Sequence, residues 1–288
     1  MKIRFIINPI SGTGKQKGIE QYIAMHFNNY DIVRTQKARE ATALSKEAVE
    51  QKFDAVIAVG GDGTVNECAK ALIGSNTALG VIPCGSGNGF AFHNGMSSNV
   101  EKAIIQLKNA SIKTIDSCTA NGLPFVNVSG IGFDAHIAHL FSNLKERGFL
   151  NYLKLIKNEV FTYQAKEYHL NYNGKSKKVT ANLIAFANAS QYGNDFCISP
   201  KAETNDGLID FVIVKELPKW KIPQLLFTVA KGKIHLSKFV RIIQTDKMII
   251  TSQEKLIHLD GEPTEVSTTL EIKSIPKSLK IFIPNGEK

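Results

Sequence analysis

The chain has 288 residues, of which 43% are hydrophobic and 21% charged, so it is long enough for two domains with substantial cores. A formal net charge of +9 favours an anionic partner, and it does not distinguish nucleotide, nucleic acid and membrane surface. The four cysteines lack a CxxC pair, which argues against a zinc site or a disulfide framework. No apolar run is long enough for a transmembrane helix or a signal peptide. We therefore expect a cytoplasmic protein, with peripheral contact with an anionic membrane surface left open.

Strand and helix patterns alternate along the first part of the chain. Apolar strand-like runs cover 3–7, 30–33, 54–59 and 78–83. Amphipathic helix patterns cover 19–27, 41–49 and 100–107, and another helix is expected after Thr64. This alternation predicts a parallel sheet with helices on both faces.

After residue 116, strand-like runs dominate. They lie at 125–130, 167–173, 178–189, 208–214, 247–252, 255–261, 269–274 and 279–284. The Asn173-Gly174 pair favours a tight hairpin turn, and helical stretches at 149–160 and 220–229 interrupt the strands. We predict two domains, residues 1–117 (α/β) and residues 118–288 (antiparallel and β-rich). The last strand, 278–288, can return to the first sheet.

The run "AVIAVGGDGTVNE" (55–67) places glycines directly after a strand of the parallel sheet, at the edge where such sheets bind ligands. Gly60, Gly61 and Gly63 let the backbone approach a phosphate closely. Asp62 would repel a phosphate, so it must meet a cation, a hydroxyl or backbone amides. Thr64 can cap the next helix, whose first turn holds Asn66 and Glu67. The alternative is an ordinary strand-to-helix turn.

Two other loops of the first domain are rich in small residues. "NPISGTGK" (8–15) fits neither a Walker A loop nor GxGxxG, and a plain helix-entry turn remains an equal alternative. "PCGSGNGFAF" (83–92) interleaves three glycines with Ser86 and Asn88, and its successive amides suit a phosphate. Two such loops after neighbouring strands are a stronger signal than either one alone.

Carboxylates and basic helices mark the second domain. Asp206 with backbone carbonyls can hold a hard cation, and Asp260 with Glu262 straddles a glycine, which suits metal binding or a general base. Simple turns are the alternatives in both places. The apolar stretches at 149–160 and 220–229 carry nearby lysines, which is typical of core-facing helices, with a membrane-contact surface as the minority interpretation.

The motifs "NPISG", "GGDGTVNE", "PCGSGNGFA", "VSGIGFDA", "NDGLID" and "DGE", in this order, resemble the diacylglycerol kinase and sphingosine kinase family of soluble lipid kinases. The resemblance runs from Asn8 to Glu262. It implies a Rossmann-like nucleotide domain and an antiparallel β-sandwich with the active site in a cleft between them. It also implies ATP and Mg²⁺ as cofactors and a lipid alcohol, such as diacylglycerol or a sphingoid base, as the phosphoryl acceptor.

The resemblance assigns roles to individual residues. Asp260 and Glu262 would be catalytic, with Asp62 on the magnesium or substrate side. The magnesium position would use Asp206 with the backbone of Glu203 and Leu208. The nucleotide contacts would come from Asn8, Thr35, Gly60, Gly61, Asp62, Gly63, Thr64, Asn66, Glu67, Gly85, Ser86 and Asn88.

Many bacterial members of this family carry Asn-Asp in the third loop, whereas Asn88 here precedes Gly89, which is closer to the sphingosine kinase pattern. This departure weakens an assignment to diacylglycerol. A kinase of a soluble hydroxyl compound such as NAD, and a nucleotide sensor without catalysis, are the alternatives. No nucleic-acid-binding module is recognisable, and the sequence leaves the oligomeric state unknown.

Overall fold

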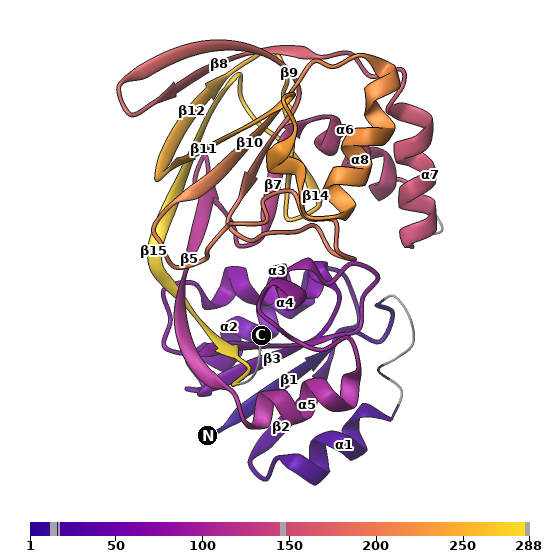
Figure 1. Cartoon of the computed structure of the whole chain (residues 1–288). Coiled ribbons are helices and arrows are strands. Elements are labelled where there is room, and N and C mark those ends of the chain that lie inside the picture. The colour runs from indigo at the N-terminus through magenta and orange to yellow at the C-terminus, as the bar shows by residue number, and fades with distance from the viewer. Residues whose placement is uncertain (12–15, 17, 145–147, 286–288) are drawn as a thin grey trace. The chain divides into compact units, whose positions relative to one another are not determined.

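The structure is a computed structural model that describes residues 1–11, 16, 18–144 and 148–285 (Figure 1). Its chain divides into two compact units, the first formed by Met1–Asp116 with Pro276–Lys288 and the second by Ser117–Ile275. Two long strands, β5 (Ser111–Ala120) and β15 (Thr269–Ile283), each run from one unit into the other. The last strand therefore starts in the second unit and ends in the first.

A parallel sheet in the order β15–β4–β3–β1–β2 forms the centre of the first unit. Besides β15, its strands are β1 (Ile3–Ile7), β2 (Tyr30–Arg34), β3 (Ala55–Gly60) and β4 (Ala78–Pro83). Every residue of β1, β3 and β4 is buried, as expected for parallel strands covered on both faces. β15 joins this sheet beside β4, where Ile281 pairs in parallel with Leu79. The predicted parallel sheet is confirmed.

Helices cover both faces of this sheet. They are α1 (Ile19–His26), α2 (Glu40–Glu50), α3 (Asp62–Leu72), α4 (Gly89–His93) and α5 (Val100–Lys108). α1 packs with α5 and α2 packs with α3, and Figure 1 shows the two pairs on opposite sides of the strands. The sequence predicted the four longer helices. It missed α4, because five residues that begin with a glycine show no helical period.

The second unit is antiparallel throughout its described strand pairs, which confirms the predicted β-sandwich class. Its strands, besides β5 and β15, are β6 (Leu123–Phe125), β7 (Val128–Gly132), β8 (Lys166–Tyr172), β9 (Lys175–Ala187), β10 (Ile209–Lys215), β11 (Val240–Thr245), β12 (Lys247–Thr251), β13 (Leu256–Leu259) and β14 (Glu262–Glu265). Alternate residues of β9 enter two apolar clusters, Phe186 on one face and Ala185 on the other. The second half of this strand is therefore buried on both faces, which explains the nearly continuous apolar sequence of residues 183–187, whereas its first half is exposed and polar.

Helical segments flank the strands of the second unit. They are α6 (Phe133–Ser142), α7 (Phe149–Glu159), the 3₁₀ turn η1 (Lys219–Lys221), α8 (Ile222–Ala230) and the 3₁₀ turn η2 (Ile234–Leu236). α8 packs Val229 and Leu225 onto the second of the two apolar clusters, with Ala185 and Val212. Among the described residues, no helix combines the length and apolar composition needed to cross a bilayer.

The structure corrects one sequence interpretation and adds four strands. The runs at 269–274 and 279–284 are parts of the single strand β15, although Pro276 lies between them. Pro276 is tolerated because it falls where β15 leaves its partner β12 and continues toward β4. The strands β5, β6, β11 and β14 were not predicted. The first half of β5 is largely exposed and polar, and β6 and β14, with 3 and 4 residues, are too short to show an apolar period.

We expect His93 in α4 to make stability dependent on pH. Burial lowers the pKa of His93 to about 4 from the usual 6.5. Between these values the unfolded chain binds more protons, so this contribution is complete above pH 6.5 and is lost as the pH falls toward 4. Urea unfolding at several pH values checks this, and His93→Gln should flatten the profile in that window. Parallel profiles for the parent and the variant would contradict the assignment.

Candidate functional site

The loops after β3 and β4 touch each other through their backbones at the carboxyl edge of the first unit's sheet. A Cβ atom on Gly85 would lie 2.3 Å from the Cα atom of Gly61. A Cβ atom on Gly60 would lie 2.5 Å from Oγ1 of Thr64, which begins the next helical turn. The glycines that the sequence singled out therefore permit two close approaches that any larger residue would block.

Asn88 closes the loop after β4. Its Oδ1 accepts a hydrogen bond from the Gly85 N–H at 2.9 Å, and its Nδ2 donates to the Gly85 carbonyl at 2.8 Å. Its backbone has φ = 60°, a left-handed conformation that Asn adopts more readily than most residues. The Asn88 N–H donates to Oδ2 of Asp62 at 2.7 Å, so the two loops are also joined by a charged acceptor.

Asp62 is the first residue of α3, and its carboxyl group lies at the N-terminal end of α4, where a negative charge is favourable. Burial raises the pKa of Asp62 above its usual value, and the backbone N–H groups of residues 88–90 oppose this by stabilising the carboxylate. Its Oδ1 is buried and has no hydrogen-bond partner in the described part of the chain. The sequence predicted a cation, a hydroxyl or backbone amides as the partner of Asp62, and its Oδ2 accepts from a backbone amide. Oδ1 is positioned for a ligand donor or a cation.

The first loop contributes Asn8, whose Nδ2 donates to Oγ1 of Thr64 at 3.0 Å and ties this loop to α3. Thr35 is buried directly after β2, and its N–H donates to the Ile7 carbonyl at 3.0 Å. Both residues therefore lie at the ends of strands in the same parallel sheet. Residues 12–15 of the motif "NPISGTGK" lie outside the described residues.

Asn66 and Glu67 differ sharply in their surroundings. The Glu67 carboxylate accepts hydrogen bonds from the N–H groups of Arg39 (3.0 Å) and Ala41 (3.1 Å), so it holds the start of α2. Asn66 is 2% exposed, and neither polar atom of its side chain has a partner among the described residues. Ser86 is exposed at the tip of its loop. Asn66 is thus a better candidate than Glu67 for contact with a ligand, because the Glu67 carboxylate already binds two backbone N–H groups.

We expect Gly85→Ala to lower the free energy of unfolding by about 1–3 kcal/mol, because the new Cβ meets the Gly61 backbone, which cannot rotate away. Gly63→Ala is the matched control: a Cβ there meets nothing within 4 Å, and alanine favours the helix. Thermal denaturation of the two variants tests this. Equal melting temperatures would show that the loop contact is not a constraint.

In the second unit, Asp260 and Gly261 form the two-residue turn of a hairpin between β13 and β14, with Leu259 paired to Glu262. Both turn residues have positive φ, 51° and 88°, which explains the Asp-Gly sequence. Glu262 is the first residue of β14 and is half-buried. The two candidate catalytic carboxylates therefore flank one glycine of a rigid turn.

The Asp260 carboxylate is fixed by backbone groups of the segment between β6 and β7. Its Oδ2 accepts from the Val126 N–H and its Oδ1 from the Asn127 N–H, both at 2.9 Å. The Asp260 N–H donates to Oγ of Ser129 at 3.1 Å. Each carboxylate oxygen has a second lone pair, so these bonds orient Asp260 without using up its capacity to accept a proton.

A buried His–Asp–Tyr cluster lies directly behind the turn. The Gly261 N–H donates to Nδ1 of His258 at 3.1 Å, so the proton of the neutral ring must be on Nε2. Nε2 then donates to Oδ2 of Asp134 at 3.2 Å, and the Tyr192 hydroxyl donates to the same oxygen at 3.1 Å. Burial and the Asp134 charge hold the pKa of Tyr192 well above its usual value.

Gly130 makes room for this cluster, since a Cβ there would lie 2.1 Å from Oδ2 of Asp134. The motif "VSGIGFDA" therefore has a packing reason. Sequence reasoning missed His258 and Tyr192. The sequence offered one indication of His258: it is a polar residue within the apolar strand that ends just before Asp260.

The expected magnesium position is the exposed turn before β10. Oδ1 of Asp206 accepts from the Leu208 N–H at 2.9 Å, which closes the turn. The donor set expected there, a carboxylate and the backbone carbonyls of Glu203 and Leu208, is all oxygen and fits Mg²⁺. Among the described residues, no three His, Cys, Asp or Glu side chains gather as a metal cluster. The magnesium position at Asp206 therefore stays a prediction.

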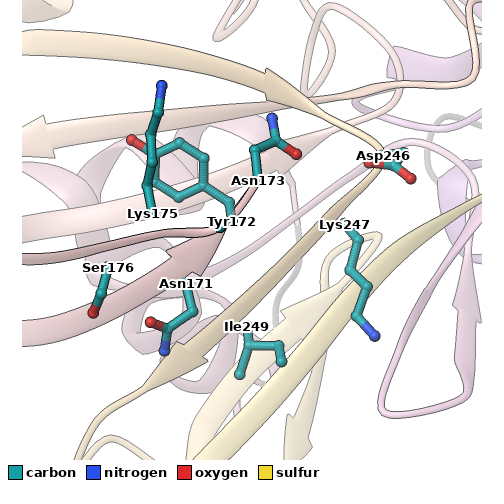
Figure 2. Close-up of a pocket in the computed structure, with 9 residues that line it drawn as sticks. Asn171, Tyr172, Asn173, Lys175, Ser176, Asp246, Lys247 and Ile249 are labelled. Atoms are coloured by element: carbon teal, nitrogen blue, oxygen red, sulfur yellow. The ribbon is translucent and has the colours of Figure 1, made fainter.

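Figure 2 shows a pocket of about 530 Å³ elsewhere in the second unit, at the turn between β8 and β9. It is lined by Asn171, Tyr172, Asn173, Gly174, Lys175, Ser176, Asp246, Lys247 and Ile249. None of the sequence-predicted site residues lines it, so it is separate from the Asp260 turn.

We expect His258→Leu to lower the free energy of unfolding by about 1–3 kcal/mol, because the Gly261 N–H and Asp134 each lose a partner in a buried setting. Tyr192→Phe is the milder comparison, since Asp134 keeps His258 as a donor. Urea unfolding of both variants measures the difference. A Tyr192→Phe variant as unstable as His258→Leu would contradict this arrangement.

Comparison with known proteins identifies two matching families. Residues 2–120 match the diacylglycerol kinase catalytic domain, and residues 127–283 match the YegS C-terminal NAD kinase beta sandwich-like domain. A diacylglycerol kinase of Bacillus subtilis is 27% identical, over 91% of this chain and 89% of its own. A protein of Chromohalobacter salexigens named "Probable lipid kinase YegS-like" is 29% identical, over 88% of this chain and 83% of its own.

The fold also has solved relatives. The crystal structure of a diacylglycerol kinase from Bacillus anthracis str. Sterne has a TM-score of 0.78 to this chain at 23% identity, covering 99% of this chain and 97% of that one. At this level of identity the similarity concerns the fold.

Proposed function

Because the chain belongs to the family of lipid kinases with a diacylglycerol kinase catalytic domain and a YegS-type C-terminal domain, we propose that it transfers the γ-phosphoryl group of ATP, with Mg²⁺, to the hydroxyl group of a lipid. In this proposal, residues 1–117 bind ATP and residues 118–288 supply the lipid and metal residues, while the end of β15 belongs to the first sheet. The acceptor is a diacylglycerol, a sphingoid base or a related alcohol.

The observation that carries the ATP assignment is a pair of buried, unpartnered polar groups beside the glycine loops. Oδ1 of Asp62 and the side-chain amide of Asn66 have no protein partner among the described residues, and buried polar groups rarely remain so. The adjoining Gly61–Gly85 contact fixes the backbone of both loops before any ligand arrives. The Asn66 Nδ2–H group can donate to a phosphate oxygen, and Oδ1 of Asp62 can accept from a ligand hydroxyl or bind a cation; phosphoryl transfer relies on such preorganised groups.

The Asp260 turn supplies the proton acceptor in this proposal. The lipid oxygen forms a bond to the γ-phosphorus as the bond to the ADP oxygen breaks, and the hydroxyl proton moves to a carboxylate oxygen of Asp260. The N–H groups of Val126 and Asn127 hold that carboxylate in one orientation, and His258 holds the turn through Gly261. Glu262 shares or assists this role. Mg²⁺, held by Asp206 with the Glu203 and Leu208 carbonyls, would neutralise charge on the phosphate oxygens when bound.

The runner-up is phosphorylation of a soluble compound such as NAD. The description of the second matching domain as NAD kinase beta sandwich-like is the observation that favours it. The paired carboxylates at Asp260 and Glu262 argue against a sensor without catalysis, since neither is needed to bind a nucleotide.

Incubation of the full chain with radiolabelled ATP, Mg²⁺, a total lipid extract and NAD tests the function. We expect label in a lipid and none in NAD. Asp260→Asn should reduce turnover by about 10²–10⁴-fold while ATP binding stays near the parental value, because asparagine suits the turn and cannot accept the proton. Label in NAD alone, or ATP binding without any labelled product, would overturn the proposal.

Asp246→Asn is the matched control, because Asp246 occupies another turn of the second unit, between β11 and β12. It should retain parental turnover. In Asp260→Asn, one of the two backbone N–H groups that donate to Asp260 would face the side-chain NH₂ group and lose its acceptor. Circular dichroism must therefore first show that the variant is folded. If it is not, Glu262→Gln provides the second test of the carboxylate pair.

A further inference from the structure

We propose that the segment Lys215–Arg241, which contains η1, α8 and η2, docks the second unit onto an anionic lipid bilayer through its exposed aromatic and lysine side chains. The inference rests on the proposed function, since a kinase of lipids must reach a membrane-embedded acceptor. It concerns a surface that takes no part in the phosphate and carboxylate sites described above. We call it the docking surface. Its members are large exposed apolar residues and lysines of this segment, namely Lys219, Trp220, Lys221, Phe227, Lys231, Lys233, Leu236 and Lys238.

One side of α8 is committed to the core and the other is apolar and exposed. Ile222 and Val229 are buried, and Val229 packs on the sheet with Ala185. Phe227 is 64% exposed and lies two residues before Val229, on the opposite side of a helix that turns about 100° per residue. Trp220, in the 3₁₀ turn η1 directly before α8, is 72% exposed. Packing within the unit does not explain these two exposed rings.

The exposed apolar residues continue beyond the helix. Leu236 in η2 is 70% exposed, and α8 contacts both η1 and η2. Large apolar side chains this exposed are ordinary when scattered, and informative when they gather on one short segment. Here three of them lie within seventeen consecutive residues, from Trp220 to Leu236.

Charge selects the partner. Lys215–Arg241 contains seven basic residues against the single acid Glu216, whereas the whole chain has 35 basic and 26 acidic residues. Nζ of Lys221 lies 4.3 Å from the centre of the Trp220 ring, and Nζ of Lys231 lies 5.9 Å from that of Phe227. Lysines beside aromatic rings can reach lipid phosphates while the rings enter the interface. A neutral apolar partner would leave these lysines without counter-charges.

Neither signal is strong alone. A lysine near an anionic bilayer strengthens binding by about fivefold, and salt screens this attraction. An apolar side chain adds roughly tenfold, and stable attachment takes both kinds of signal together. The combination predicts reversible binding to anionic bilayers and weak binding to neutral ones.

Trp220 is the only tryptophan of the chain, so its fluorescence reports directly on the docking surface. We expect its emission to shift to shorter wavelength when vesicles of equimolar phosphatidylcholine and phosphatidylglycerol are added, and to change little with phosphatidylcholine alone. Vesicle flotation without ATP measures the binding separately from any kinase activity. The double variant Phe227→Ser/Leu236→Ser, which keeps the reporter, should bind at least about tenfold more weakly. Lys219→Gln/Lys233→Gln should weaken binding and its dependence on salt.

Met25→Ser is the matched control, because Met25 is 73% exposed on α1 of the first unit. It should bind vesicles like the parent. Failure of the parent to bind anionic vesicles, or equal binding by the double variant and Met25→Ser, would overturn the docking surface. A parent dimer that becomes a monomer in the double variant, with vesicle binding unchanged, would assign the surface to a second copy instead. Parental vesicle binding without lipid phosphorylation would overturn the kinase proposal and leave the docking surface intact.

Discussion

The backbone contact between Gly61 and Gly85 is the constraint on which the candidate phosphate site depends. It allows the loops after β3 and β4 to touch without intervening side chains. Because they touch, Asp62 can accept the Asn88 N–H and its charge lies at the start of α4. Asn88 in turn closes its own loop on Gly85. A Cβ atom on Gly85 would overlap the Gly61 backbone and push the loops apart, which would weaken the hydrogen bond from Asn88 to Asp62.

In the second unit, a carboxylate is also held in one orientation by backbone groups. Its turn carboxylate, Asp260, is held by two backbone N–H groups, and the turn itself is held by the neutral ring of His258. Asp134 fixes the tautomer of that ring, and Gly130 leaves the space for Asp134. The proton positions follow from one N–H: Gly261 must donate, so His258 must accept on Nδ1. A chain of buried hydrogen bonds of this kind orients a reactive group more firmly than a flexible side chain could by itself.

The outer surface of α8 differs, because its exposed apolar side chain Phe227 is not covered by any described part of the chain. Core packing explains Val229, and it does not explain Trp220 or Phe227. An anionic lipid interface would accommodate both groups, because the rings can enter the interface while the lysines of the same segment contact the lipid phosphates. The chain thus has polar sites whose hydrogen-bonding groups are held in place by the backbone, and one surface on which apolar side chains are exposed to water.

The amino-acid sequence by itself determined the fold class, since apolar periods of two and of about 3.6 residues are local properties of a strand or a helix. It also identified Asp62, Asp206 and Asp260 as turn carboxylates, because glycine neighbours mark turns. The tertiary structure decided which groups those residues meet. It showed that Glu67 holds the start of α2, that Asn66 is buried without a partner among the described residues, and that His258 accepts a hydrogen bond from the turn that contains Asp260. It also joined two apparent strands across Pro276. These outcomes depend on contacts between residues far apart in the chain, which no local pattern records.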